Sequence, residues 1–225
     1  PAVFTAFPGR KAISWIPDFQ HCLWPEVFPQ AERQARDEDA AKVVANASLL
    51  VFSSEAVRED FQKILPGQQV QTAVLPFYSY PQQQWYEGRP QETAAAYALP
   101  ERFFICCNQF WIHKNHKILG DALKILKEQY GLEIPIVCTG SARDHRTPLY
   151  ADLLKQYWIS QGISEQIYLL GMLQREDQLQ LIRRSLAVVQ PSLCEGWSTV
   201  VEDARAFGKT ILLSDLPVHL EQQPR

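Results

Sequence analysis

The chain has 225 residues, of which 46% are hydrophobic and 21% are charged, the balance of a globular protein that can bury a core. Its net charge of −3 and its scattered basic residues argue against nucleic acid as a partner. No apolar stretch approaches the roughly 18 residues that span a bilayer, no signal segment opens the chain, and the five cysteines lack Cys-x-x-Cys spacing. A cytoplasmic protein with core thiols is therefore expected.

Apolar runs alternate with helical periodicity in the first third of the chain, which is typical of a parallel sheet packed against helices. The patterns predict strands at residues 12–16, 49–53 and 70–76 and helices at residues 31–47 and 57–65. From residue 79 to residue 100 the sequence is rich in Pro, Gln, Tyr and Ala and follows no sustained period. We therefore predict a first unit over residues 1–80 and a linker over residues 81–100.

The second unit, residues 101–225, shows the same alternation more clearly. Its predicted strands are residues 103–107, 134–139, 167–170, 187–190 and 210–213, and its predicted helices are residues 115–130, 150–161, 177–185 and 199–207. Four successive crossovers of this kind indicate a doubly wound sheet, whose ligands bind beyond the carboxyl ends of the strands. Functional residues are expected in the loops after Cys107, Thr139, Leu170 and Gln190.

Several common α/β activities are disfavoured by missing motifs. The ten glycines never occur as Gly-x-Gly, so the dinucleotide-binding fingerprint is absent, and no Gly-Lys-Ser/Thr triplet forms a phosphate loop. No Gly-x-Ser-x-Gly elbow presents a nucleophilic serine. Dehydrogenase, P-loop and hydrolase activities are therefore not expected.

The segment from Pro191 to Glu221, PSLCEGWSTVVEDARAFGKTILLSDLPVHLE, resembles the donor-binding signature of the family 4 retaining glycosyltransferases. In that signature Pro-Ser and Glu-Gly-aromatic-Gly precede a helix with a second carboxylate, and a last strand leads to Asp-x-Pro-x-x-x-Glu. The resemblance implies the α/β GT-B fold, in which two Rossmann-like, doubly wound parallel-sheet domains face a cleft. It also implies that residues 1–80 are the C-terminal part of an incomplete acceptor domain, that residues 101–225 are a C-terminally truncated donor domain, and that the chain is a fragment.

Two carboxylates carry the expected donor contacts. In the family, seven residues separate two glutamates; here Glu195 is followed eight positions later by Asp203, with Glu202 as the competing candidate. On a helix Glu202 lies nearly opposite the apolar stripe and Asp203 lies on its flank, so we assign the second carboxylate to Asp203. The residues of that stripe are Val200, Val201, Ala204 and Phe207. The resemblance implies that Glu195 accepts hydrogen bonds from donor-sugar hydroxyls and Asp203 from the ribose diol.

The residues after Glu195 complete this expected site. Gly196 allows close backbone approach, and Trp197 stands at the aromatic position of the motif. A helix N-terminus able to hold a diphosphate is expected from the amides of Ser198, Thr199 and Val200. Ser198 stands where many relatives have glycine.

Residues 103–126, FFICCNQFWIHKNHKILGDALKIL, resemble the family's first donor-domain strand, the loop after it and a helix that begins with Lys-Asn-His. Lys114 would then neutralise the departing diphosphate. A plain solvated lysine is the other reading, although a cation is unfavourable at a helix start. The family's arginine position is held by Gln109, next to Asn108. An amide can donate to phosphate but carries no charge, so charge compensation is weaker or another basic residue supplies it.

Two further patches are candidates by resemblance. Gly171, Met172 and Leu173 follow a strand and would contact the nucleobase by backbone and apolar face. In the first unit, Asp18 and His21 lie where relatives carry a polar acceptor-side loop, and either could contact the acceptor or the sugar. A turn cap for Asp18 and an ordinary loop histidine for His21 are equally open.

No metal and no cofactor are expected besides the nucleotide-sugar substrate. Asp37-Glu38-Asp39 spells the Asp-x-Asp of metal-dependent GT-A enzymes, but it sits inside a charged helix and reads as a solvated face. His113 and His116 are three residues apart without Cys or carboxylate partners, which is poor ligand geometry.

The sequence therefore predicts transfer of a glycosyl group from a nucleoside diphosphate sugar to a hydroxyl acceptor with retention, in polysaccharide, cell-envelope or glycoconjugate synthesis. The acceptor is expected to be a carbohydrate or a lipid-linked sugar, and docking of the protein on the cytoplasmic face of a membrane is left open. The alternatives are a GT-B epimerase, a glycogen synthase, or a non-catalytic nucleotide-binding module, which Gln109 and Asp203 favour. This 225-residue chain is expected to bind donor without transferring sugar.

Overall fold

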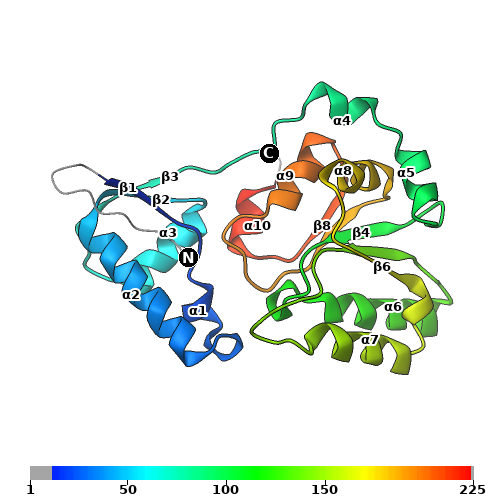
Figure 1. Ribbon diagram of the computed structural model, residues 1–225, viewed down its shortest axis with the longest axis horizontal. Coiled ribbons are helices and arrows are strands. Elements are labelled where there is room, and N and C mark those ends of the chain that lie inside the picture. The colour runs from blue at the N-terminus through cyan, green and yellow to red at the C-terminus, as the bar shows by residue number, and fades with distance from the viewer. Residues whose placement is uncertain (1–11, 224–225) are drawn as a thin grey trace.

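The computed structural model describes residues 12–223, which form two α/β units joined by a connecting segment (Figure 1). Each unit is built on a parallel sheet, one of three strands and one of five. A loop that follows a strand of the second sheet touches a loop that follows a strand of the first: a Cβ added to Gly196 would lie 2.0 Å from the Pro17 carbonyl oxygen. The α/β class and the GT-B arrangement expected from the sequence are thus confirmed.

The first unit contains the sheet with the order β1-β2-β3. Its strands are β1 (Ala12–Ile16), β2 (Ala47–Phe52) and β3 (Gln71–Val74). Its helices are α1 (Gln20–Leu23), the 3-10 turn η1 (Pro25–Val27), α2 (Gln30–Asn46) and α3 (Glu55–Ile64). α3 begins after Ser54 because the Ser54 hydroxyl accepts a hydrogen bond from the Val57 amide at 3.1 Å.

Helices cover one face of this first sheet. The side chains that pack together there are Ile16, Phe19, Val43, Leu50, Phe52, Val57 and Phe61. The opposite face carries Ile13 and Trp15, which are 73% and 52% exposed. Within residues 12–78, therefore, helices cover one face of the sheet, and the double winding expected for this unit, with helices on both faces, is not seen.

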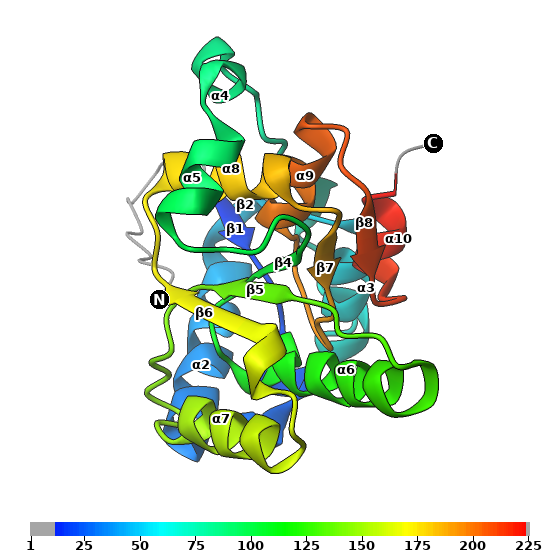
Figure 2. The same cartoon turned by 90° about the vertical axis from the view of Figure 1, so that its right-hand side faces the viewer.

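The connecting segment contains two short helices, α4 (Gln83–Glu87) and α5 (Pro90–Ala96). Residues 81–100, expected to be a linker, thus contain helical structure. Pro90 begins α5, where a missing amide hydrogen leaves no bond unmade, and Ala94 is buried in the core of the second unit. Figure 2 shows α5 lying against α8 (Arg175–Arg184), so the end of the segment belongs structurally to the second unit.

The second unit contains the five-stranded sheet with the order β6-β5-β4-β7-β8, in which all neighbours are parallel. Its strands are β4 (Phe104–Cys107), β5 (Ile136–Thr139), β6 (Ile167–Gly171), β7 (Val188–Gln190) and β8 (Ile211–Leu213). The chain moves outward from β4 to β6 and then returns to the other side of β4. This reversal places a topological switch point between β4 and β7.

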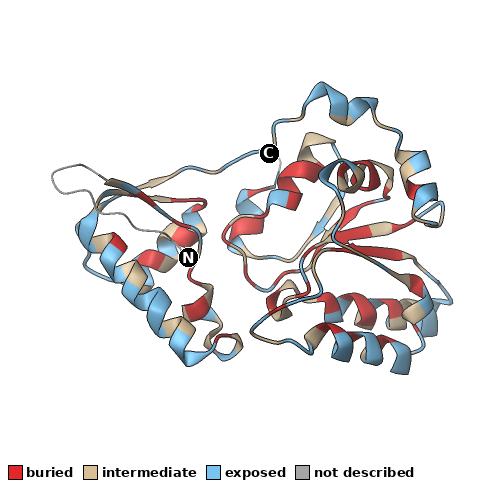
Figure 3. Ribbon diagram, viewed as in Figure 1, coloured by how far each residue is buried: buried red, intermediate tan, exposed pale blue. Residues whose placement is uncertain are grey.

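Helices cover both faces of the second sheet (Figure 1). The remaining elements are η2 (Ile112–Lys114), α6 (His116–Tyr130), α7 (Tyr150–Ser160), η3 (Ser164–Gln166), α9 (Thr199–Ala206) and α10 (Pro217–Glu221). Along β4, Cys106 packs in the core under α6 and α7, and Ile105 packs in the core under α8 and α9. The alternation follows from the two-residue repeat of a strand, and the buried strands stand out in Figure 3.

The predicted strands and long helices are confirmed, with boundaries that shift by a residue or two. α1, α4, α5 and α10 were not predicted, because four to seven residues are too short to show a helical period. None of the helices in the described part of the chain is both long and apolar enough to cross a membrane.

Candidate functional site

Two buried amide side chains meet at the switch point. Asn108 follows β4 and Gln190 ends β7. Asn108 Nδ2 donates to Gln190 Oε1 at 2.7 Å, and Gln190 Nε2 donates to Asn108 Oδ1 at 3.3 Å. The two amides satisfy each other and hold the two loops together. Asn108 was expected near the donor, whereas Gln190 was considered only as the end of a strand.

An ion pair lies beside these amides. Lys114 Nζ is 2.6 Å from Glu195 Oε1, and the two side chains are 14% and 6% exposed. Gln190 Nε2 donates to the same carboxylate oxygen at 2.8 Å. Shielding from water strengthens both interactions. The structure thus brings together Lys114 and Glu195, two of the residues predicted to contact the donor.

The backbone around Lys114 is fixed by the next residue. Asn115 adopts the left-handed conformation with φ of +55°, a region that asparagine tolerates better than most residues. Its side chain donates to the Pro191 carbonyl at 3.2 Å. The loop after β4 and the loop after β7 are therefore tied together on both sides of the ion pair.

The residues after Glu195 form the contact with the first unit. Gly196 lies so close to Pro17 that any side chain would force the backbone apart. Trp197 Nε1 donates to the Phe77 carbonyl at 2.8 Å, and the Phe77 and Trp197 rings lie 6.2 Å apart. Gly196 and Trp197 therefore hold the two units together here, whereas the sequence assigned them to the donor.

The start of α9 is only partly as expected. The Ser198 amide donates to Gln222 Oε1 at 3.2 Å, and Gln222 Nε2 donates to the Ser198 carbonyl at 3.0 Å. Ser198 is buried, so the prediction that its amide holds a diphosphate does not fit this arrangement. Thr199 is exposed at the first turn and Val200 is buried, which leaves their amides as the remaining donors for an anion.

Asp203 is engaged by an arginine that the sequence analysis did not single out. Arg175 Nη1 and Nη2 donate to Asp203 Oδ2 and Oδ1, each at 2.5 Å, and the Ser79 hydroxyl donates to Oδ1 as well. The Asp203 side chain is 1% exposed and that of Arg175 is 46% exposed. A ribose diol can reach this carboxylate only where one of these partners yields. Trp85 packs 5.4 Å from the Arg175 guanidinium.

Glu202, the competing carboxylate, is also buried. Arg205 Nη1 lies 3.1 Å from Glu202 Oε1, and Gln222 Nε2 donates to the same oxygen at 2.7 Å. The side of α9 opposite the apolar stripe is therefore covered rather than solvated, because α10 packs beside it. Glu202 is thus held by Gln222, the residue that follows α10.

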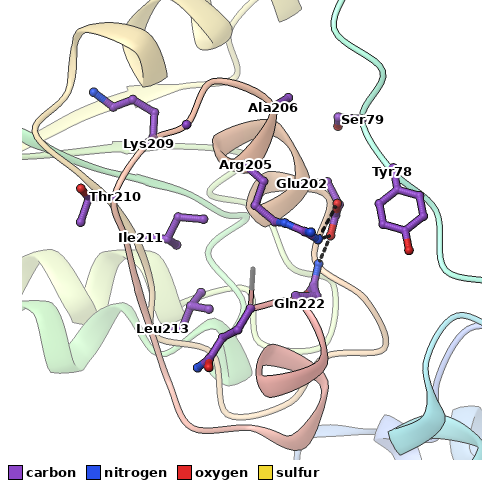
Figure 4. A pocket seen from close by; sticks show the side chains of 12 residues that line it. Tyr78, Ser79, Glu202, Arg205, Ala206, Lys209, Thr210, Ile211, Leu213 and Gln222 are labelled. Atoms are coloured by element: carbon purple, nitrogen blue, oxygen red, sulfur yellow. Dashed lines mark hydrogen bonds and ion pairs between the residues drawn. The ribbon is translucent and has the colours of Figure 1, made fainter. Parts of the chain in front are cut away.

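Figure 4 shows where Glu202 points: it lines a cavity of about 830 Å³ together with Arg205, Lys209 and residues of the edge strand β8. Neither Lys114 nor Glu195 lines this space. Ligands of doubly wound sheets bind beyond the carboxyl ends of the strands, and this cavity runs along the side of β8. We therefore do not place the donor site there.

Asp18, a candidate for contact with the acceptor or the sugar, lies near Glu195. Both line a space of about 120 Å³ between the units, together with Trp15, Ser53 and Trp197. Asp18 Oδ1 also accepts a hydrogen bond from the Gln20 amide at 3.1 Å. The turn-cap role and the position in the cleft therefore coexist.

His21 is not brought to this space. Its ring is buried, and Nε2 lies 3.2 Å from Asp37 Oδ1 on α2. Burial lowers the pKa of His21, although Asp37 opposes the shift. The prediction that His21 contacts substrate does not fit this position, because α2 supplies the carboxylate that captures the ring.

The strand-end residues expected under the nucleobase follow β6. Gly171 has φ of +68°, a conformation that favours glycine, and its carbonyl accepts from the Gly140 amide at 2.7 Å. Met172 is 69% exposed, while Leu173 packs against the core under α8 and α9. Gln109 is exposed. An apolar surface for a base is thus offered by Met172.

A metal-binding arrangement was not expected from the sequence. Among residues 12–223, one group of candidate ligand atoms lies within 4.8 Å of one another, those of His21, Cys22 and Asp37. His116 instead stacks on Phe110 with ring centroids 4.2 Å apart, and the buried His113 ring lies tilted against Trp111 with ring centroids 5.4 Å apart. Asp37 lies on helix α2, so the Asp-x-Asp triplet does not end a strand.

Charges gather around Cys194, which lies between the units. Burial raises the pKa of its thiol to about 12, with further contributions from the carboxylates of Asp18, Glu195 and Asp60. Burial also lowers the pKa of His113 to about 4, and the Lys114 charge adds to that shift. Three carboxylates and one lysine thus surround the point where the units meet.

Two further contacts join the units, one on either side of the cleft. The Glu221 carboxylate accepts hydrogen bonds from the Glu55 and Ala56 amides at 2.8 and 2.7 Å, which caps α3 from the other unit. On the far side, the Arg146 guanidinium lies 4.8 Å from the Phe28 ring of the first unit and 4.8 Å from the Trp111 ring of the second. Spacing along the chain gives no signal for either contact.

Comparison with solved structures shows the same fold in several glycosyltransferases. Anabaena Alr3699/HepE, solved with UDP and glucose, superposes with a TM-score of 0.75 at 19% identity, over 96% of this chain and 56% of that one. Sucrose-phosphate synthase from Thermosynechococcus elongatus superposes with a TM-score of 0.71 at 16% identity, over 91% and 50% of the chains. WaaG, a glycosyltransferase of lipopolysaccharide biosynthesis, superposes with a TM-score of 0.70 at 15% identity, over 94% of this chain and 58% of that one.

This chain therefore spans between half and three fifths of the length of these structures. A search of curated proteins returned no match. The family model described as Glycosyl transferases group 1 matches residues 92–222, which include the whole second sheet, Lys114, Glu195 and Asp203. The match covers more than half of the chain, and the protein belongs to the glycosyl transferases group 1 family.

Proposed function

We propose that this protein transfers a glycosyl group from a nucleoside diphosphate sugar to a hydroxyl acceptor with retention at the anomeric carbon. The observation that carries the proposal is the shielded pair of Lys114 and Glu195 at the switch point, 2.6 Å apart. It lies where a doubly wound sheet binds its ligand and faces the first unit through Gly196. A cation for a departing diphosphate and a carboxylate for sugar hydroxyls are thus placed side by side.

Lys114 carries the electrostatic part of this proposal. Negative charge grows on the diphosphate as its bond to the sugar breaks, and a fixed cation in a shielded site stabilises that charge. Gln109 is neutral, so Lys114 and the Thr199 and Val200 amides supply most of the compensation. We infer that no divalent ion is needed for this step.

Glu195 carries the positioning part. Gln190 and Lys114 hold one of its oxygens, which leaves the other to accept hydrogen bonds from sugar hydroxyls. When the diphosphate draws Lys114 away, Glu195 gains further capacity to bind the sugar. Donor binding and release of the ion pair are therefore coupled.

The proposed transfer takes place on one face of the sugar. The bond from the anomeric carbon to the diphosphate oxygen breaks, the acceptor oxygen bonds to the same face of that carbon, and the acceptor proton passes to the leaving diphosphate. Configuration is retained, and Asp18 lies near enough to Glu195 to orient the acceptor or the sugar. The complex of Anabaena Alr3699/HepE with UDP and glucose supports a uridine nucleotide as the first donor to test.

Titration calorimetry with UDP and a panel of UDP-sugars tests donor binding. Incubation with labelled donors and mixed sugar acceptors tests transfer, and the anomeric coupling constant of the product reports retention. An inverted product would refute the mechanism. Roles in polysaccharide or cell-envelope synthesis, a cytoplasmic location and docking on a membrane stay part of the proposal and depend on the acceptor found.

A non-catalytic nucleotide-binding module is the second candidate. The engagement of Asp203 by Arg175 and Ser79 and the neutral Gln109 favour it. Because this 225-residue chain is itself expected to bind donor without transfer, UDP binding without donor hydrolysis or transfer would support this candidate only in a protein of the length of the solved glycosyltransferases. Release of free, epimerised sugar would instead indicate an epimerase, and extension of a glucan would indicate a glycogen synthase.

A further inference from the structure

A second cavity touches Glu195 from the side of α3. It has a volume of about 350 Å³ and is lined by both units: Trp24, Asp60 and Lys63 come from the first, and Cys194, Glu195 and Leu216 are among those from the second. Ligand sites commonly occupy roughly 300 to 1,000 Å³, so this cavity is large enough for a sugar unit. The space beside Asp18, at about 120 Å³, is not.

The position of the cavity suits the acceptor. Its first-unit wall consists of residues that follow β1 and β2, and its second-unit wall includes Glu195, the carboxylate proposed to hold the donor sugar. An acceptor seated here would share Glu195 with the donor sugar, because Glu195 lines the cavity. Val218 and Pro217 close the floor from α10, the helix that Glu221 docks on α3.

The charges of the wall select against anions. Glu59, Asp60 and Glu195 contribute carboxylates, and the charge of Glu195 is already balanced by Lys114 at 2.6 Å. The one lysine of the first-unit wall, Lys63, lies 3.7 Å from Glu59 and is thereby balanced. Among residues 12–223, none of the ion pairs or side-chain hydrogen bonds involves Asp60, whose pKa is raised by partial burial. Asp60 is thus an acceptor without a partner, facing a space that repels phosphate.

The apolar part of the wall has the character of a sugar-binding surface. Trp24 presents a flat ring, and Leu193 and Leu216 continue the apolar surface on the other side. The apolar face of a hexose ring packs well on an indole, while its hydroxyls donate to a carboxylate. Trp24 and Asp60 lie in the same cavity and supply one of each.

We propose that this cavity is the acceptor subsite and that it takes a neutral sugar, stacked on Trp24 and hydrogen-bonded to Asp60, in preference to a phosphorylated one. The proposal rests on the proposed function, because it is the donor at Glu195 that makes this sugar an acceptor. It names a substrate class that neither the fold nor the family determines.

The test compares methyl glucoside with glucose 6-phosphate as probes, using proton–nitrogen spectra of the whole chain. The indole signal of Trp24, identified with Trp24→Phe, should shift with methyl glucoside, and glucose 6-phosphate should bind at least tenfold more weakly. Asp60→Lys should reverse that preference. Glu38→Gln, an exposed carboxylate change on α2, is the matched control and should change neither affinity.

Parallel titration with UDP separates this inference from the proposed function. UDP binding combined with an unchanged Trp24 signal, or with a preference for glucose 6-phosphate, would overturn the acceptor subsite and leave the donor proposal standing. A sugar-dependent Trp24 shift without UDP binding would keep the sugar site and overturn the donor proposal. The wild-type spectra decide the matter even where a variant fails to fold.

Discussion

The Lys114 ammonium and the Glu195 carboxylate lie 2.6 Å apart although they are 81 residues apart in the chain. Each holds the other at the carboxyl ends of β4 and β7 before any donor is present. A positioned pair of this kind lowers the cost of ordering the site when substrate arrives. Binding of a diphosphate must also break the pair, so the two residues are expected to respond differently to substitution.

Lys114→Met should depress turnover more strongly than it weakens nucleoside binding, because charge grows on the diphosphate as the bond breaks. Loss of one such stabilising group typically costs about 10²- to 10³-fold in turnover. Glu195→Gln, of the same shape, should instead weaken the binding of UDP-sugar relative to UDP. Calorimetry gives the affinities for uridine, UDP and UDP-sugar, and transfer assays give the turnover. Together they separate the role of Lys114 from that of Glu195. Equal losses for uridine and UDP in Lys114→Met would contradict the role of the lysine.

Asp203→Asn should weaken UDP binding about ten- to hundredfold, the usual cost of a lost charge-assisted hydrogen bond. Glu202→Gln is the matched control, since Glu202 lies next to it on α9 but faces Arg205 and α10. Calorimetry of both variants decides between the two carboxylates. If Glu202→Gln weakens UDP and Asp203→Asn does not, the assignment of the ribose contact is wrong.

Arg175→Gln should destabilise the fold more than Asp203→Asn does. The Asp203 side chain is 1% exposed and that of Arg175 is 46% exposed, so removing the arginine strands a buried charge while removing the carboxylate leaves a solvated one. Because solvent screens the half-exposed arginine, the loss of stability should be smaller than for a fully buried ion pair. We expect a loss of about 2 kcal/mol for Arg175→Gln and about 1 kcal/mol for Asp203→Asn. Urea unfolding of both variants and of the double variant gives the coupling. Equal costs for the two single variants would show that burial does not control this pair.

Glu221→Gln should loosen the first turn of α3, because it removes the charge that caps the Glu55 and Ala56 amides. A cap of this kind is worth about 1 kcal/mol, so hydrogen exchange of these two amides should speed up roughly fivefold. Spin labels on the two units should show a broader distance distribution. Ser54→Ala is the control, because it removes a cap within the same unit and should speed exchange near Val57 without changing that distribution. Unchanged exchange at Glu55 and Ala56 in Glu221→Gln would refute the contact.

Elements long enough to show several repeats of an apolar pattern could be predicted from the sequence, because burial of one face imposes that pattern on the residues. The strands β4 to β8 and the helices α6 and α9 follow from alternating or helical apolar patterns and were placed to within a residue or two. α5 was missed because seven residues show less than two turns, and its helical state depends on burial of Ala94 against α8. Tertiary packing, not local propensity, decides such a segment.

Some residues of the candidate site could likewise be predicted from the sequence and others could not. The loops that carry Asn108, Lys114 and Glu195 could be expected at the carboxyl ends of strands from the alternation of elements, and the residues themselves from the family resemblance, but the order β6-β5-β4-β7-β8 that makes those strands neighbours could not. Arg175 could not, because its pairing with Asp203 depends on how α8 and α9 cross. The contact of His21 with Asp37 could not be predicted for a similar reason: it is set by the angle of α2 and leaves no pattern in the residues between them.

His113 should make the protein lose stability as pH falls below about 6.5. Its ring is buried, Nε2 has no hydrogen-bond partner, and burial with the nearby Lys114 charge lowers its pKa to about 4. Below pH 6.5 the unfolded chain binds a proton there and the folded chain does not until about pH 4, so stability declines through this window. Between pH 7.5 and 5 the loss from His113 should be about 2 kcal/mol, at roughly 1.4 kcal/mol per pKa unit. Burial also lowers the pKa values of His21 and His219, so part of the decline should persist in His113→Gln. Urea unfolding at half-unit steps of pH measures these slopes above the range where carboxylates titrate. A slope in His113→Gln equal to that of the wild type would show that this histidine accepts its proton as readily in the folded protein as in the unfolded chain.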